Sequence, residues 1–322
     1  MSNTEADPAE LLCSEQPGEG VTVLTPRDVP LGGPRAIRVR RTLPQRRRSL
    51  IGAWCFADHY GPQDVSQSGG MDVAPHPHTG LQTASWLFSG EIEHRDSIGT
   101  RAMVRPGELN LMTAGHGIAH SEVSTPDAAV LHGVQLWIAL PDAYRDTARD
   151  FRHYAPPLLE LSGATARVFL GSLAGTTSPV PAFTPLLGAE LTVAPGATLA
   201  LDVDPAFEHG VLQDIGSVTV AGATLATGEL AYLAPGAGRL ELANSGAEPA
   251  RVLLLGGTPF TEELVMWWNF VGRSHEEIAE YREAWQAQAD RFGQVEGYQG
   301  TTAWLPAPTL PQVRIKPRRN PS

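Results

Sequence analysis

Residues that form turns recur at short intervals along this sequence, and they limit the chain to short elements. The 322 residues include 33 glycines and 27 prolines. Between them lie short apolar segments, for example at 81–88, 109–113 and 134–140. Strands at such close spacing are typical of β-sandwiches and β-barrels. We therefore predict an all-β fold in which turns connect short strands.

The strand-rich sequence falls into two halves that share a motif. Residues 106–115 (PGELNLMTAG) resemble residues 227–236 (TGELAYLAPG), 121 positions later. A match of this kind in two strand-rich halves indicates a duplicated β-barrel. The last clear element is a helix, because Ser274 and Glu277 have the spacing of a capping box. The apolar residues that follow fall on one helical face: Ile278, Tyr281, Ala284 and Trp285.

These patterns divide the chain into five parts. They are an acidic leader at 1–20, a first barrel at 21–140, a linker at 141–165, a second barrel with the closing helix at 166–298, and an extended tail at 299–322. Within the linker we predict a short helix over 141–152. The N-terminus lacks the basic start and apolar run of a signal peptide. No segment approaches the roughly 18 consecutive apolar residues of a membrane span, so we expect no membrane association.

The overall charge argues against one class of partner. The net charge is −11, and nucleic-acid binding normally requires a basic surface. The sequence does contain one local basic run: Arg40, Arg41, Arg46, Arg47 and Arg48. We interpret this run within 35–48 as a solvated strand face and hairpin turn, with an anion-binding or partner-binding patch as the alternative. The two cysteines, Cys13 and Cys55, do not indicate a structural disulfide and fit a reducing cytoplasm.

Two short segments carry the residues for a metal site. His76 and His78 are two positions apart, and so are His120 and Glu122. Residues two apart on a strand point to the same face, so each pair can direct both side chains to one point. Three imidazole nitrogens and one carboxylate oxygen suit a borderline divalent metal and leave coordination positions open. The alternative for each residue is a surface or core side chain with a satisfied hydrogen bond.

The remaining histidines fit ligation less well. His116 and His120 would align on a helix, but the flanking glycines at 115 and 117 argue against a helix there. We expect His116 to line the pocket or to support a ligand, and we place His94 at the surface. His59 lies in an unusual polar cluster at 58–60. The second half lacks an equivalent His-x-His and His-x-Glu set, so we predict one metal per chain, in the N-terminal barrel.

Ordered motifs carry a resemblance to a known family. They are residues 52–62 (GAWCFADHYGP), 76–83 (HPHTGLQT), 112–122 (MTAGHGIAHSE), 269–271 (NFV) and 276–278 (EEI). Together they resemble the pirin family, a group of bicupins, over roughly residues 30–292. Gln82 stands where a glutamate is frequent in that family, and His116 where better-known members often have arginine.

The resemblance implies a fold and a metal. It implies two cupin (jelly-roll) β-barrels facing each other with a C-terminal helix, and iron in the N-terminal barrel. The residues on the ligand positions of the family are His76, His78, His120 and Glu122. We expect one divalent metal per chain, with Fe(II) favoured over Mn, Cu, Ni or Zn. The expected substrate pocket contains Phe56, His59, Gln82 and His116.

Three functions fit these features. The first is a dioxygenase of the quercetin 2,3-dioxygenase type, which brings a flavonol-like aromatic substrate and dioxygen to the metal, with Glu122 as the catalytic base. The second is an iron-dependent redox sensor that binds a protein partner without turnover, for which the basic run is the candidate surface. The third is a scaffold that the metal stabilises.

Overall fold

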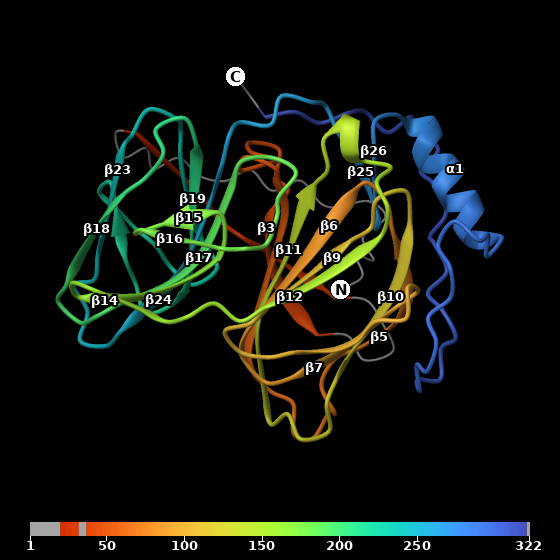
Figure 1. The fold of residues 1–322 in the computed structure, drawn as a ribbon, viewed down its shortest axis with the longest axis horizontal. Coiled ribbons are helices and arrows are strands. Elements are labelled where there is room, and N and C mark those ends of the chain that lie inside the picture. Colours follow the sequence, from red (N-terminus) through yellow and green to blue (C-terminus); the bar gives the residue numbers. More distant parts are fainter. Residues whose placement is uncertain (1–19, 32–36, 321–322) are drawn as a thin grey trace.

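The computed structural model describes residues 20–31 and 37–320, which form two β-barrels side by side (Figure 1). Cys13 and the other residues of the predicted leader at 1–19 lie outside the described residues. Strands make up nearly all of the regular structure, and one α-helix lies near the C-terminus. The all-β, two-barrel prediction is therefore confirmed.

The first barrel combines a seven-stranded sheet with a four-stranded sheet. The larger sheet has the order β12-β9-β6-β11-β4-β3-β2, and the smaller has the order β5-β10-β7-β8. The strands are β2 (Arg27–Pro30), β3 (Arg38–Leu43), β4 (Trp54–Asp64), β5 (Asp72–His78), β6 (Leu81–Ser89), β7 (Ile92–Asp96), β8 (Arg101–Val104), β9 (Leu109–Thr113), β10 (Ile118–Ser124), β11 (Val130–Ala139) and β12 (Asp150–Tyr154). Every pairing in both sheets is antiparallel.

The second barrel repeats this plan. Its sheets have the orders β1-β22-β19-β24-β17-β14-β13 and β18-β23-β20-β21, and a hairpin of β15 and β16 is added. The strands are β1 (Val21–Leu24), β13 (Leu159–Leu161), β14 (Ala164–Leu170), β15 (Ser172–Leu173), β16 (Thr176–Thr177), β17 (Leu186–Val193), β18 (Thr198–Asp202), β19 (Glu208–Ile215), β20 (Thr219–Val220), β21 (Ala223–Thr224), β22 (Leu230–Leu233), β23 (Arg239–Ala243) and β24 (Ala250–Gly257). Strands β9 and β22 come from the two halves of the repeated motif, and both lie second in their sheets.

The two large sheets pack against each other and create one core between the barrels. Phe169 of the second barrel contacts two tryptophans of the first, with ring centroids 6.5 Å from Trp54 and 4.6 Å from Trp86. A glycine allows the closest approach: Gly52 has φ +52°, and an added Cβ would lie 2.7 Å from the Cα of Gly257. No L side chain fits there without moving a backbone.

Strand pairing shows that the boundaries between the two barrels and the linker differ from those expected from the sequence. Strand β1 was assigned to the first barrel, but it pairs with β22 of the second. Strand β12 lies in the predicted linker, but it pairs with β9 and completes the first sheet. The helix predicted over 141–152 shrinks to one 3₁₀ turn, η1 (Asp142–Tyr144). These pairings depend on partners distant in sequence, which local patterns do not reveal.

The C-terminal segment packs on the first barrel, on the side away from the second (Figure 1). It contains β25 (Val265–Trp267), β26 (Phe270–Gly272) and α1 (His275–Gln286). The predicted cap is confirmed, because the Oγ of Ser274 accepts a hydrogen bond from the backbone N–H of Glu277. The buried face of α1 is Ile278, Tyr281 and Trp285. The helix predicted to close the second barrel therefore covers the first.

Three of the five arginines of the basic run do not belong to a solvated face. Arg41 is 1% exposed and makes a two-point ion pair with Asp58, at 2.7 Å for each bond. The Arg48 guanidinium lies 3.7 Å from the centre of the Tyr232 ring. Arg40 donates a hydrogen bond to His59. For these three arginines the surface prediction was wrong, since their cationic groups pair with partners inside the molecule.

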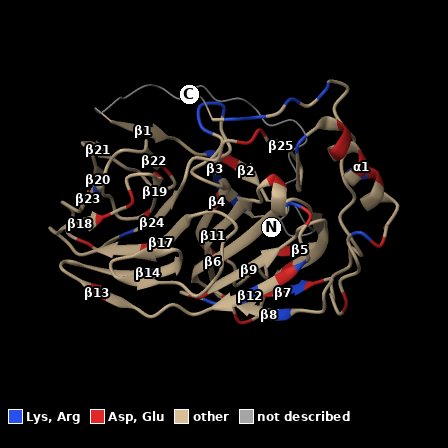
Figure 2. Ribbon diagram, turned by 45° about the horizontal axis from the view of Figure 1, so that its top comes forward, with Lys and Arg blue, Asp and Glu red and all other residues tan. Residues whose placement is uncertain are grey.

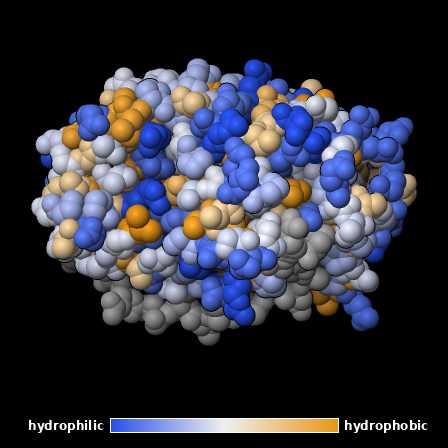
Figure 3. Space-filling model, turned by 90° about the horizontal axis from the view of Figure 1, so that it is seen from below, coloured by the Kyte–Doolittle hydropathy of each residue, from blue (hydrophilic) through white to orange (hydrophobic). Residues whose placement is uncertain are grey.

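The outer surface is mixed in character. Figure 2 shows acidic and basic positions close together on β7 and β8, where Glu93 pairs with Arg95 and Arg101 at 2.6 and 2.7 Å. On the face shown in Figure 3, apolar side chains lie in small groups among polar ones. No helix among the described residues is long and apolar enough to cross a membrane.

Candidate metal centre

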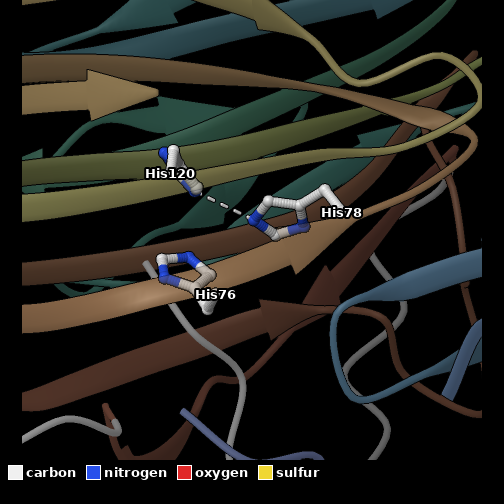
Figure 4. A group of neighbouring side chains, drawn as sticks. All are labelled: His76, His78 and His120. Atoms are coloured by element: carbon white, nitrogen blue, oxygen red, sulfur yellow. Dashed lines mark hydrogen bonds between the residues drawn. The ribbon is translucent and has the colours of Figure 1, made fainter. Parts of the chain in front are cut away.

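Three histidines meet inside the first barrel. Strand β5 carries His76 and His78 on one face, and pairing with β10 places His120 directly opposite His76. All three side chains are fully buried. Their ring centroids lie 4.3 to 5.2 Å apart, and the rings converge in Figure 4. The structure therefore brings together the three imidazoles that the sequence placed on two strands.

Hydrogen bonds determine which ring nitrogen of each histidine faces the centre. The Nδ1 of His76 lies 2.9 Å from the carbonyl oxygen of Ala74, and the Nδ1 of His78 lies 3.0 Å from that of Asn269. A carbonyl only accepts, so each Nδ1 carries the proton and each Nε2 keeps its lone pair. The Nε2 of His76 is buried and has no hydrogen-bond partner among the described residues. Such anchoring is the usual arrangement of metal-ligating histidines.

The spacing and charge of these nitrogens suit a divalent metal. The Nε2 atoms of His78 and His120 lie 3.1 Å apart, as the dashed line in Figure 4 marks. Two ligands at a right angle on metal–nitrogen bonds of about 2.1 Å would lie about 3.0 Å apart. Burial lowers the pKa of His76, His78 and His120 well below the ordinary value. All three are therefore neutral at pH 7, as ligation requires.

Glu122 shares His120 with this group. It lies two residues further along β10 and is 1% exposed. Its carboxylate is within 4.8 Å of ring nitrogens of His120 and His94, so it belongs to a second, overlapping group of possible ligands. The register of β5 against β10 shifts between His120 and Glu122. Such an irregularity redirects side chains and is common beside functional sites.

His94 is a member of the centre that the sequence analysis placed wrongly at the surface. It is 2% exposed, and its Nδ1 lies 3.4 Å from the Nδ1 of His120. Its Nε2 lies 3.1 Å from the Oδ2 of Asp96. The Oδ1 of Asp96 accepts backbone N–H groups from Ile98 and Thr100, both at 3.0 Å. The chain His120–His94–Asp96 thus directs the lone pair of His120 Nε2 toward the other two histidines.

A sequence signal for His94 did exist. In residues 92–96 the buried positions Ile92, His94 and Asp96 alternate with the paired surface residues Glu93 and Arg95. This period of two marks one buried face.

Two of the expected pocket residues, Gln82 and His116, have contacts with residues other than the ligand histidines. Gln82 donates a hydrogen bond to Thr113 at 2.9 Å. Ser85, three positions along the regular strand β6, faces Glu122, so Gln82 points to the opposite side of the sheet. His116 lies in the turn before β10, where its Nδ1 is 3.5 Å from the carbonyl oxygen of Thr147.

Phe56 lies near the site but behind another ring. It stacks on Trp137 with ring centroids 4.0 Å apart, and the ring of Trp137 lies 5.1 Å from that of His78, at an interplanar angle of 74°. The aromatic side chain that reaches the histidines is therefore Trp137. Sequence reasoning did not single out this residue.

His59 belongs to a separate cluster between the barrels. The Nε2 atoms of His59 and His132 each lie 2.6 Å from the Oδ1 of Asp214, and Arg251 donates to its Oδ2 at 2.6 Å. Burial disfavours the charge of Asp214, but the hydrogen bonds from both histidines outweigh it and hold its pKa below the usual range. Three groups of described residues have ligand atoms close enough to share a metal, and Asp214 is the only member of these groups that comes from the second barrel.

The hydrogen bonds of this cluster argue against a metal. Arg40 donates to the Nδ1 of His59 at 3.0 Å, and a guanidinium never accepts. The Nε2 of His59 therefore carries the proton and donates to Asp214, which leaves no lone pair for a cation. The cluster instead joins β4 and β11 of one barrel to β19 of the other.

The chain is similar to proteins of known families along most of its length. Residues 36–138 match the Pirin family model, and residues 188–293 match the model of the Pirin C-terminal cupin domain. A Pseudomonas aeruginosa protein named "Putative quercetin 2,3-dioxygenase" is 46% identical, covering 97% of this chain and 98% of its own. A pirin-like protein of Caulobacter vibrioides is 36% identical over 77% of this chain and 88% of its own.

Solved structures show the same likeness. A crystal structure of quercetin 2,3-dioxygenase from Acinetobacter baumannii has a TM-score of 0.87 and 38% identity, and covers 93% of this chain and 98% of its own. A bacterial pirin from Escherichia coli, solved in complex with nickel(II), shares the fold with a TM-score of 0.57 and 15% identity, covering 74% of this chain and 100% of its own.

Proposed function

Because this chain belongs to the pirin family, we propose that it is a metal-dependent dioxygenase of the quercetin 2,3-dioxygenase type, acting on a flavonol-like aromatic substrate. The observation that carries the proposal is the convergence of three neutral, buried histidines whose Nδ1 atoms are each anchored. Similarity to proteins named for this activity in Pseudomonas aeruginosa and Acinetobacter baumannii supports the reaction class.

The residues of the centre fit one metal. His76, His78 and His120 would hold it, and Glu122 would complete the set with an anionic oxygen. We propose Fe(II) as the resident metal, because this mixture of nitrogen and oxygen donors suits iron, while Mn, Cu, Ni and Zn remain able to bind. A divalent metal bound there supplies Lewis-acid polarisation of a substrate hydroxyl and redox chemistry with dioxygen.

The chain supplies the proton transfer and the dry environment. We assign Glu122 as the base that takes the proton from a substrate hydroxyl, since the carboxylate is buried beside His120. The stacked rings of Phe56 and Trp137 give the chamber an aromatic wall next to His78. In a dioxygenase both oxygen atoms enter the products, so the substrate supplies the electrons and no separate reductant is needed.

The proposed setting is the cytoplasm. Cys55 is a free, fully buried thiol whose pKa is raised by burial to about 12. Such a thiol persists most readily in a reducing compartment.

The regulator alternative loses part of its support. It relied on the basic run as a partner surface, but Arg40, Arg41 and Arg48 are engaged by His59, Asp58 and Tyr232 within the molecule. We therefore put the enzymatic function first.

Oxygen consumption tests the proposal. Metal-free protein would be reloaded separately with iron(II), manganese, copper, nickel or zinc and mixed with quercetin in air. We expect uptake with at least one redox-active metal, and two ¹⁸O atoms from ¹⁸O₂ in the products by mass spectrometry. The His76→Ala variant is the matched control and should consume none. If no metal supports uptake, the dioxygenase proposal fails.

A further inference from the structure

One face of β11 points to the interior of the first barrel, where the histidines lie. Gln135 and Trp137 lie two positions apart, and their part of the strand pairs regularly with β6. The Oε1 of Gln135 lies 2.8 Å from the Oγ of Ser85, which is 3.3 Å from the Oε1 of Glu122. The rings of Trp137 and His78 lie 5.1 Å apart, at an interplanar angle of 74°. Gln135 therefore lies on the side of the centre where Glu122 is, and Trp137 lies next to His78.

Both side chains carry a buried polar atom to which no described residue forms a hydrogen bond. Each residue is 1% exposed, and neither the Nε2 of Gln135 nor the Nε1 of Trp137 has a hydrogen-bond partner among the described residues. The buried tryptophans at 54, 86 and 285 each donate from Nε1 to a carbonyl or carboxylate oxygen, and Trp267 shares with Trp137 an Nε1 that lacks a partner among the described residues. A buried donor without a partner is costly, so two on one chamber wall require an explanation.

We propose that Trp137 and Gln135 form a substrate-binding wall that hydrogen-bonds the oxygen substituents of a planar enolic aromatic compound. The proposal rests on the dioxygenase function above and specifies its substrate class. Trp137 Nε1 donates to one substrate oxygen near His78, and the Gln135 amide contacts another near Glu122. Residues two apart on a strand are about 7 Å apart along it, so one oxygen atom cannot satisfy both. The substrate therefore carries at least two oxygen substituents.

The Gln135 amide can serve a substrate before and after proton transfer. A half-turn of the amide exchanges its NH₂ group and its oxygen. In one orientation the NH₂ group faces the substrate and Ser85 donates to Gln135. In the other, Gln135 donates to Ser85, Ser85 donates to the Glu122 carboxylate, and the amide oxygen accepts from a substrate hydroxyl. Either orientation leaves one amide atom directed at the substrate.

Probe binding to the zinc-loaded protein tests this wall without turnover. The probe is 4-nitrocatechol, an aromatic compound with two neighbouring oxygens whose absorption changes on binding. Trp137→Phe keeps an aromatic ring and removes only the N–H, and Gln135→Leu removes the amide. We expect each variant to raise the probe Kd by about tenfold, the usual effect of losing a hydrogen bond to a charged oxygen. Zinc content should stay at the wild-type value.

Trp267→Phe is the matched control. Its Nε1 is also buried without a partner among the described residues, but it lies in the C-terminal hairpin. The control should keep the wild-type Kd. The wall is refuted if the wild type does not bind the probe, or if Trp137→Phe and Gln135→Leu both stay within twofold of it. Oxygen uptake with quercetin is scored separately. A wild type that binds the probe but consumes no oxygen overturns only the dioxygenase function, and turnover with unchanged KM in both variants overturns only the wall.

Discussion

Replacing His94 should weaken metal binding although His94 is not one of the four proposed ligands. In His94→Leu, the Nδ1–H of His120 loses its acceptor at 3.4 Å, while the anchors of His76 and His78 remain. Loss of such a supporting residue typically lowers metal affinity by about 10- to 100-fold. Because 3.4 Å is long for a hydrogen bond, we expect the lower end, about tenfold or about 1.4 kcal/mol.

Chelator competition with Zn²⁺ measures the affinity directly, and the thermal midpoint at fixed excess zinc provides a second reading. His94→Gln offers an amide oxygen to His120 and should recover part of the affinity. His153→Leu is the control, because His153 is exposed and bonds Asn110. The reasoning fails if His94→Leu binds zinc as tightly as the wild type, or if only its metal-free midpoint falls.

Three further predictions concern stability. Asp214→Asn removes the carboxylate that pairs with Arg251 within the second barrel and with His59 and His132 of the first barrel, and should lower the free energy of unfolding by about 3 kcal/mol in urea titrations, whereas exposed Asp202→Asn should change it little. Burial lowers the pKa of His59, so the folded state resists protonation there, and stability should fall as pH drops below about 6.5. In the metal-free protein, the thermal midpoint should fall less between pH 7.5 and 5.5 in His59→Gln than in the wild type. An equal fall in both proteins would contradict this. Ser274→Ala should cost about 1 kcal/mol through loss of the α1 cap, and Ser274→Asp should retain most of it.

Local patterns identified the parts of the site that lie on single strands. The spacing of His76 and His78, and of His120 and Glu122, follows directly from the two-residue period of a strand. The α1 cap at Ser274 is equally local, because all of its hydrogen bonds fall within one helical turn.

Features that depend on pairing between strands distant in sequence could not be predicted from local sequence patterns. His94 meets His120 only because β7 pairs with β10. His59 was expected in the pocket, but β4 turns it toward Asp214, which lies 155 residues away. Gln82 shows the same problem on a smaller scale, since a shift of one residue along β6 would have turned it to the face of the sheet on which Ser85 contacts Glu122.

The centre also depends on a segment outside its own barrel. The acceptor for His78 is the carbonyl oxygen of Asn269, which lies in the two-residue turn between β25 and β26. The preceding residue, Trp268, has φ +53°, a left-handed conformation that costs a bulky side chain about 1 to 3 kcal/mol. Its ring is buried and packs at 5.3 Å against Phe270, which offsets the strain. The fold thus maintains an unfavourable backbone at the position that orients His78. The turn at 268–269 is therefore part of the metal centre, although neither of its residues is a proposed ligand.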